Sequence, residues 1–151
     1  MSSAGTVLLC IGNTLRRDDG AAHALADLLE ARAAAGLHIV RAFQLLPDHA
    51  EHLAAAARAV LCDAALPDGR PPHIDTHTPD PNAVSGLHGP GLDALAALAL
   101  TVYGRCAELF VCSIPCHDFS HGEGLSPEAR TNVAAAAVLL GQFLDAENGH
   151  A

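Results

Sequence analysis

Two adjacent carboxylates stand in the stretch IGNTLRRDDG, which runs from Ile11 to Gly20 and follows an apolar segment. Asp18 is placed to cap a following helix, because an aspartate there accepts a backbone N–H from the first turn and contributes about 1 kcal/mol. Asp19 is not needed as a cap and is therefore the better candidate for chemistry. Asp63 ends a second apolar run, AVLCD, where the alternative is a simple turn-forming role. Carboxylates in such places bind divalent cations or exchange protons with water.

The elements that must position these acids alternate between strand-like and helix-like apolar patterns. Short apolar runs predict buried strands, a polar-apolar alternation predicts an edge strand, and longer amphipathic runs predict helices. The order indicates an α/β fold with a mostly parallel sheet of about five strands, covered on both faces. The expected strands are 6–11, 37–43, 59–63, 73–77 (the edge strand) and 109–114, and the expected helices are 18–35, 47–57, 90–103 and 126–145.

Open parallel sheets bind ligands at the carboxyl ends of their strands, where the connecting loops form a crevice. The loop that carries Asp19 follows the first expected strand, and Asp63 is expected as the last residue of the third. If these two strands are neighbours, the two side chains face one another across the same edge of the sheet. The sequence therefore predicts two converging carboxylates.

The 151 residues are expected to form one domain, 1–151, because the only linker-like segment, 67–81, is too short to separate two cores. A formal net charge of -9 argues against nucleic acid or an anionic membrane as a partner. Five cysteines without a CxxC pair fit a reducing compartment, and no leader or membrane-spanning run is evident, so we expect a cytoplasmic protein. A nucleotide cofactor is not expected, because the Gly-x-Gly-x-x-Gly pattern is absent.

Several other polar or nucleophilic groups carry weaker signals. Cys62 lies within an apolar strand and is expected to pack as a small hydrophobe. Two arginines of the first loop either hold substrate oxygens or are solvated. Polar residues of the expected edge strand are interpreted as protecting that edge rather than binding zinc, and two histidines after the last strand could line the cleft. These groups are Arg16, Arg17, His73, Asp75, His77, His117 and His121.

Four segments follow one another over nearly the whole chain: IGNTLRRDDG, FQLLPDHAEHLAAAARAVLCDAAL, SGLHGPGLDALAALALTVYG and GEGLSPEA. In order and spacing they resemble the hydrogenase maturation endopeptidase family, especially members that serve soluble, bidirectional-type nickel-iron hydrogenases. The resemblance implies a three-layer α/β/α fold with a twisted sheet. It also implies a peptidase that removes the C-terminal extension of a hydrogenase large-subunit precursor after nickel insertion.

In that family an acid in the first loop, an aspartate ending a later strand and a histidine before a helix together bind a metal. The resemblance maps the two acids onto Asp19 and Asp63. The histidine departs from the pattern: relatives read like HHL before a proline, whereas this chain reads SGLHGP, with Gly86 at the usual position. A two-residue shift in this glycine-bracketed loop would bring His88 to the same point. The alternatives are a solvated His88 or a lost third ligand.

Two carboxylates and one imidazole suit a borderline ion such as nickel, zinc or cadmium. Two mechanisms are open: the three side chains recognise nickel already seated in the substrate, or a bound ion activates water or polarises the scissile carbonyl. The first explains why an unloaded precursor would be spared, and we favour it, with one carboxylate helping to activate water. The alternative function is a non-catalytic metal-sensing or chaperone-like module that binds the immature large subunit without cutting it.

Overall fold

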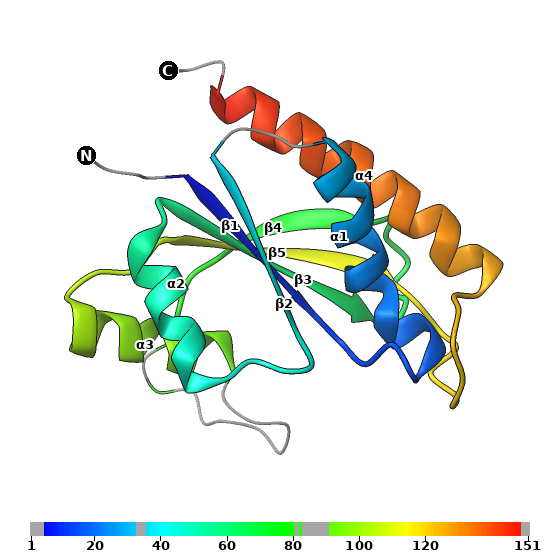
Figure 1. Cartoon of the computed structure of the whole chain (residues 1–151), viewed down its shortest axis with the longest axis horizontal. Coiled ribbons are helices and arrows are strands. Elements are labelled where there is room, and N and C mark those ends of the chain that lie inside the picture. Colours follow the sequence, from blue (N-terminus) through cyan, green and yellow to red (C-terminus); the bar gives the residue numbers. More distant parts are fainter. Residues whose placement is uncertain (1–4, 33–35, 81, 83–90, 149–151) are drawn as a thin grey trace.

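The computed structural model describes residues 5–32, 36–80, 82 and 91–148. In this part of the chain, five strands form one twisted sheet in the order β2-β1-β3-β5-β4 (Figure 1). β1, β2, β3 and β5 are parallel, and β4 pairs antiparallel with β5 at one edge. The first and third expected strands are therefore neighbours, as the convergence of the two acids requires. The strands are β1 (Thr6–Ile11), β2 (Leu37–Ala42), β3 (Arg58–Ala65), β4 (His73–His77) and β5 (Glu108–Pro115).

Helices cover both faces of the sheet. Figure 1 shows α1 and α4 on one face and α2 and α3 on the other, so the three-layer α/β/α prediction is confirmed. None of the helices in the described ranges combines the length and the apolar character that a bilayer crossing needs. The helical elements are η1 (Arg17–Gly20), α1 (Ala21–Arg32), η2 (Pro47–His49), α2 (Ala50–Ala55), α3 (Leu92–Tyr103) and α4 (Pro127–Asn148), η marking a short 3-10 turn.

The apolar run of β1 is buried along its whole length because the strand has helices on both sides. Successive side chains of a strand point to opposite faces. Leu8 and Cys10 pack in the core under α1 and α4, whereas Val7 and Leu9 pack in the core under α2 and α3. The two aliphatic cores on either side of β1 fix the register of this strand, because a slip of one residue would move the side chains of each face into the opposite core.

Two expectations about element ends are corrected. The helix expected from Asp18 begins as an α-helix only at Ala21, after the 3-10 turn η1. Asp63 is not the last residue of its strand, because β3 continues to Ala65 through its pairing with β5. The pairing of β3 with the shorter β1 ends at Cys62, however. Asp63 is therefore the first residue of β3 beyond the β1 pairing, next to the point where the β1 chain leaves the sheet.

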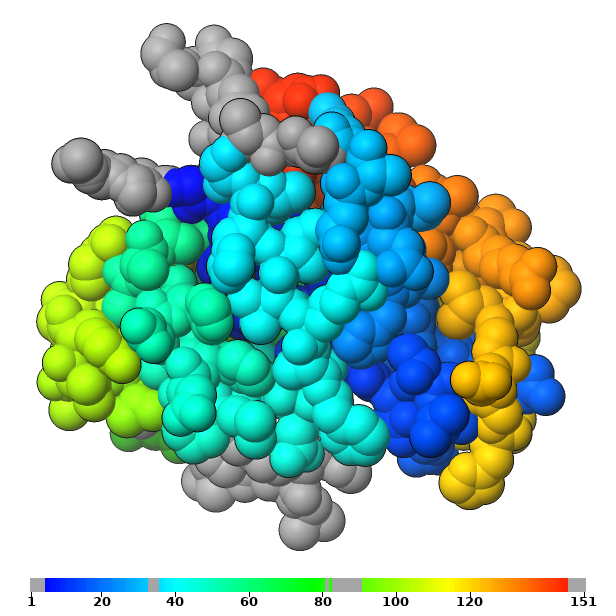
Figure 2. All heavy atoms as spheres, viewed as in Figure 1, coloured from blue at the N-terminus to red at the C-terminus, as the bar shows by residue number. Residues whose placement is uncertain are grey.

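The described chain begins and ends at the amino edge of the sheet, where the parallel strands start (Figure 1). Thr6 N donates to Gly36 O across this edge over 3.0 Å. An ion pair of 2.7 Å between Arg32 and Asp145 ties the end of α1 to the last turns of α4. Figure 2 shows that β2, in cyan, forms the exposed side of the sheet between α1 and α2.

Candidate functional site

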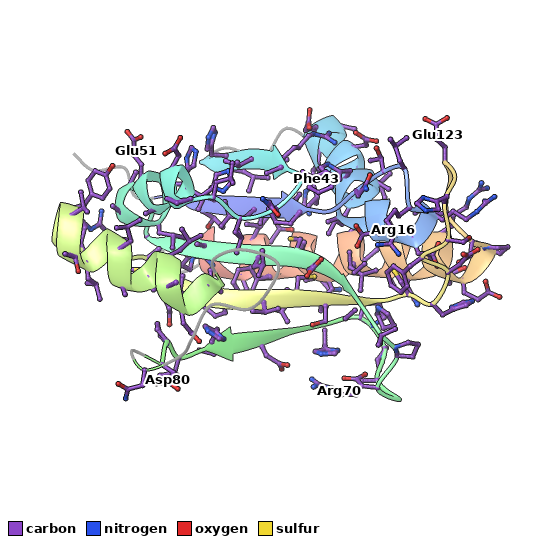
Figure 3. The ribbon with its side chains drawn as sticks, turned by 90° about the horizontal axis from the view of Figure 1, so that it is seen from below. Arg16, Phe43, Glu51, Arg70, Asp80 and Glu123 are labelled. Atoms are coloured by element: carbon purple, nitrogen blue, oxygen red, sulfur yellow. The ribbon has the colours of Figure 1, made fainter. Side chains whose placement is uncertain are left out.

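A cleft of about 430 Å³ opens at the carboxyl edge of β1, β2 and β3. Asp19 and Asp63 both line it, so the structure brings together the two acids that the sequence singled out. Figure 3 shows Phe43 and Arg16 on the side of the sheet where β1 and β2 end. Its lining is both polar and apolar and consists of Ile11, Gly12, Asn13, Arg16, Asp19, Phe43, Gln44, Leu45, Asp63 and Ala64.

Asp19 is positioned by the turn that precedes it. Its Oδ2 accepts a hydrogen bond of 2.7 Å from the backbone N–H of Asn13. Gly12, at φ +151°, lets the chain pass so close to Asp19 that a Cβ on Gly12 would lie 1.9 Å from the Asp19 carbonyl oxygen. The Gly12 carbonyl is in turn 2.8 Å from His23 Nε2 on α1. The sequence signal for this geometry is the Gly-Asn pair after the strand.

Asp63 is a half-buried carboxyl group whose surroundings disfavour its charged form. Burial and the nearby negative charge of Asp19 raise the pKa of Asp63 to about 6, against a smaller lowering by the backbone N–H of Ala64. The charge effect shows that the two carboxyl groups interact. A carboxyl group with a pKa near neutrality in a cleft is suited to accept and return a proton.

Asp18 does not cap the helix that follows it, contrary to the sequence-based expectation. Its fully buried carboxylate instead accepts hydrogen bonds from the N–H groups of Ser126 (2.8 Å), Asp118 (3.1 Å) and His117 (3.4 Å). The Ser126 hydroxyl also donates to Asp18 over 2.8 Å and accepts from Ala129 N–H in the first turn of α4. Burial opposes ionisation of Asp18, but these donors lower its pKa below the ordinary value.

The loop after β5 is also joined to the loop after β1 by backbone hydrogen bonds. Arg17 N–H donates to Gly122 O, and Gly122 N–H donates to Leu15 O, both over 2.9 Å. Arg16 Nε donates to Phe119 O over 3.1 Å, which leaves the exposed guanidinium at the rim of the cleft. The side chain of Arg17 lies instead against Gly122. Of the two arginines, only Arg16 lines the cleft.

Cys116, directly after β5, does not line the cleft but lies within the electrostatic reach of its acids, which the sequence did not indicate. Its thiol is fully buried, and burial followed by the negative charges of Asp18, Asp19 and Asp63 raises its pKa to about 12. The thiol therefore stays protonated beside three carboxyl groups. Its position follows from the pairing of β3 with β5, because Cys116 N–H donates to Ala65 O over 2.8 Å, and a single apolar strand carries no signal of that proximity.

The other sequence candidates lie away from the cleft. Cys62 is fully buried in the core, as expected. On β4, His73 Nε2 lies 3.5 Å from Asp75, which also pairs with Arg70, and His77 Nε2 lies 2.6 Å from Asp93 of α3. His117 lies 3.7 Å from Glu128 and does not line the cleft, and neither does the exposed His121.

The third expected ligand, His88, lies outside the described residues. Within the described ranges, no three His, Cys, Asp or Glu side chains are arranged to hold a metal ion. The donor set of Asp19 and Asp63 nevertheless fits a divalent cation, because two interacting carboxyl groups in one cleft lose their mutual repulsion when a cation binds both. A metal there would require ligands beyond these two, from His88, the substrate or water.

Comparisons with known proteins identify the fold. No protein-family model and no curated protein matches the sequence. Among solved structures, the [NiFe] hydrogenase maturation protease HybD from Thermococcus kodakarensis matches with a TM-score of 0.69 and 21% identity, covering 93% of this chain and 99% of that one. The maturating endopeptidase HybD from E. coli matches with a TM-score of 0.69 and 17% identity, covering 90% of this chain and 89% of that one.

The maturation protease HycI from Thermococcus kodakarensis KOD1 gives a TM-score of 0.68 at 18% identity, with 94% of this chain and 93% of that one covered. The chain thus has the fold of hydrogenase maturation proteases over nearly its whole length. The fold implied by the sequence resemblance is confirmed.

Proposed function

We propose that this chain is a hydrogenase maturation endopeptidase, which removes the C-terminal extension of a nickel-iron hydrogenase large-subunit precursor after nickel insertion. The observation that carries the proposal is the pair of interacting carboxyl groups, Asp19 and Asp63, in one cleft of a fold shared with maturation proteases. The sequence resemblance adds His88 as the third group of the site. The precursor is the macromolecular substrate, and its nickel is part of that substrate.

Asp19 and Asp63 are the groups that would hold the nickel of a loaded precursor, together with His88. A divalent ion in the cleft, either that nickel or a zinc ion, supplies positive charge that polarises a peptide carbonyl or a water molecule. Recognition of nickel in the substrate would restrict cleavage to precursors that have received their metal. Arg16, at the rim, carries a guanidinium suited to the carbonyl or carboxylate oxygens of the peptide.

Asp63 is the better candidate for a general base of the two acids, because in the metal-free cleft its pKa of about 6 makes it more basic than an ordinary aspartate. Asp63 accepts a proton from water as the water oxygen bonds to the scissile carbonyl carbon. It returns that proton to the amide nitrogen as the C–N bond breaks. Asp19, whose Oδ2 accepts a hydrogen bond from Asn13 N–H, is held in position in the same cleft.

The test is mass spectrometry of a nickel-loaded large-subunit precursor before and after incubation with the purified protein. We expect the precursor to lose its C-terminal peptide with wild-type protein and to stay intact with Asp19→Ala or Asp63→Ala. His88→Ala is expected to impair cleavage. Asp68→Ala is the matched control, because this exposed aspartate lies in the turn before β4, where it accepts a local hydrogen bond from Arg70 N–H.

A nickel-free precursor should remain uncut, and equal cleavage with and without nickel would contradict recognition of nickel by the site. Normal cleavage by Asp19→Ala or Asp63→Ala would exclude the cleft as the catalytic site. A stable complex on native gels without loss of mass from the loaded precursor would instead support the non-catalytic binding module.

A further inference from the structure

Three histidine rings lie near one another beside β2 and α2, and two of them, those of His38 and His52, lie at the amino edge of the sheet, at the opposite end of the strands from the acidic cleft. His38 is the second residue of β2, His49 closes η2, and His52 lies on α2. The ring centres of His38 and His52 are 5.4 Å apart with an interplanar angle of 36°. The ring of His49 lies 6.2 Å from that of His52. Sequence spacing alone gave no reason to connect these residues, because only the folded chain brings His38 of β2 beside His52 of α2.

The rings of His38 and His52 line one small cavity. Its volume is about 200 Å³, which is room for an ion and several water molecules. Its lining is Gly5, Thr6, Val7, Gly36, His38, His52, Ala55 and Ala56.

The three rings differ in whether their nitrogens are engaged. His49 Nδ1 accepts a hydrogen bond of 2.9 Å from Leu46 N–H, which fixes this ring to its own turn. Within the described chain, neither His38 nor His52 has a hydrogen bond to another protein group. His38 is exposed and His52 is half-buried. Two imidazoles with unengaged nitrogens therefore border the same water-accessible space.

The surroundings also keep His52 in the form that binds metals. Burial lowers its pKa, the charges of His38 and His49 lower it further, and only the nearby Glu51 acts in the opposite direction. The lowered pKa favours the neutral imidazole, which is the form that binds metals. The net charge of -9 favours cations at the surface as a whole.

We propose that His38 and His52 form a second metal-binding site, which takes a borderline divalent transition ion such as Zn²⁺, Ni²⁺ or Cu²⁺. Imidazole nitrogens bind such ions at about 2.0–2.1 Å, so two rings that share one ion at a tetrahedral angle have centres roughly 5 Å apart. The observed 5.4 Å matches this separation. Because no group of three ligating side chains is formed in the described ranges, water completes the coordination.

Binding at this site would join the exposed strand β2 to α2 without involving the acidic cleft. The inference is therefore independent of the proposed peptidase function. It also bears on any metal analysis of the protein, because an ion counted per chain would not by itself report on Asp19 and Asp63.

The test is isothermal titration calorimetry of the full chain, free of any purification tag and of metal, with ZnCl₂ and with NiCl₂. We expect one binding event that survives Asp63→Asn and is lost in the double variant His38→Gln/His52→Gln. Each single variant should weaken this event at least tenfold, since one imidazole cannot chelate. His121→Gln is the matched control, because this exposed histidine lies far along the chain in the loop after β5.

Thermal denaturation without metal shows whether each variant is folded. If variants that carry His52→Gln do not fold, the single variant His38→Gln is sufficient for the test, because the exposed His38 is not expected to be needed for folding. Long-range ¹H–¹⁵N spectra of the imidazoles should show Zn²⁺-dependent shifts at His38 and His52. The proposal is overturned if the event persists unchanged in a folded His38→Gln variant. It is equally overturned if no event remains after Asp63→Asn.

Discussion

At the residue scale, the fold holds a carboxyl group under conditions that disfavour its charge. Asp63 is half-buried and lies within the electrostatic reach of Asp19, and these two causes raise its pKa to about 6. Active-site groups commonly show such shifts, because placing a proton acceptor near the working pH requires an environment that costs stability. Asp63 should therefore reduce the stability of the metal-free protein at neutral pH.

Replacement of Asp63 by asparagine is expected to raise the free energy of unfolding of the metal-free protein at pH 7.5 by about 1–3 kcal/mol. The pKa is about 6 in the folded state and near 3.8 in the unfolded chain. As the pH falls through this window, the folded wild type takes up a proton that the unfolded chain does not. Wild-type stability therefore rises, and the advantage of the variant disappears by about pH 4. Urea denaturation between pH 4 and 8 measures this, with Asp68→Asn as the exposed control; a difference independent of pH would refute the interpretation.

Gly12 provides a second prediction at this scale. Its Cβ position lies 1.9 Å from the carbonyl oxygen of Asp19, and its φ of +151° is unusual for other residues. Gly12→Ala must move the loop that carries Asp19 and is expected to destabilise by about 2–4 kcal/mol. Gly69→Ala, at φ +83° with nothing within 4 Å of the new Cβ, should cost only about 1–2 kcal/mol. Chemical denaturation measures the free energy of unfolding of both variants. Equal losses of stability would show that the close approach of Gly12 to Asp19 is unimportant.

At the element scale, one carboxylate connects three parts of the structure. Asp18 belongs to η1, and it accepts hydrogen bonds from the loop after β5 and from Ser126, the residue that caps α4. The turn next to Asp19 is thereby fixed to an element more than a hundred positions away in the sequence. The position of Asp19 should depend on these bonds even though Asp18 does not line the cleft.

Asp18→Ala is expected to lower the free energy of unfolding by about 3–5 kcal/mol, because several buried donors lose their acceptor. The hydrogen bonds keep the pKa of Asp18 below 3.8, so this stability is present above about pH 4 and is lost as the pH falls further. Asp118→Ala should cost less than about 1 kcal/mol, since among the described residues the Asp118 side chain accepts hydrogen bonds only from Ser120, two residues on. Urea titrations at pH 7 and pH 4 compare the two, and similar losses at pH 7 would contradict the anchoring role.

The sequence was sufficient for elements that are decided locally. The apolar run of β1 and the alternation of β4 predicted both strands with their observed bounds. The role of Asp18 was predicted wrongly, because its donors lie 99 to 108 residues away and a local cap was the simpler interpretation. The end of β3 was placed too early, because the longer partner β5 extends it. Residues such as Gln44 line the cleft only because β2 lies beside β1, and no local sequence pattern predicts that strand order.

At the scale of the whole molecule, the two cores are separated by a sheet that carries a row of thiols. Cys10 pairs in register with Cys62, and Cys62 pairs with Cys112, so adjacent strands bring three cysteines side by side under α1 and α4. Contacts with the other two thiols and burial raise the pKa of Cys62 well above its usual range. These thiols should react only when the cores open.

Ellman's reagent at pH 8 is expected to modify one thiol per native chain, Cys106, which is the only half-buried cysteine, the other four being buried. All five should react in urea, and the slow phase in native buffer should follow the rate of global unfolding. Cys106→Ser should abolish the fast reaction. Fast modification of a second thiol in the native protein would show that one core opens independently of the other.

The start of β1 and the end of α4 lie together on the side of the sheet opposite the cleft (Figure 1). The protein can therefore be tethered to a sensor chip next to the start of β1 or the end of α4, so that the acidic cleft faces the bulk solution. A large precursor protein in solution would then reach the cleft without steric hindrance from the chip. Immobilisation through the loops after β1, β2 or β3 would instead bury it against the chip.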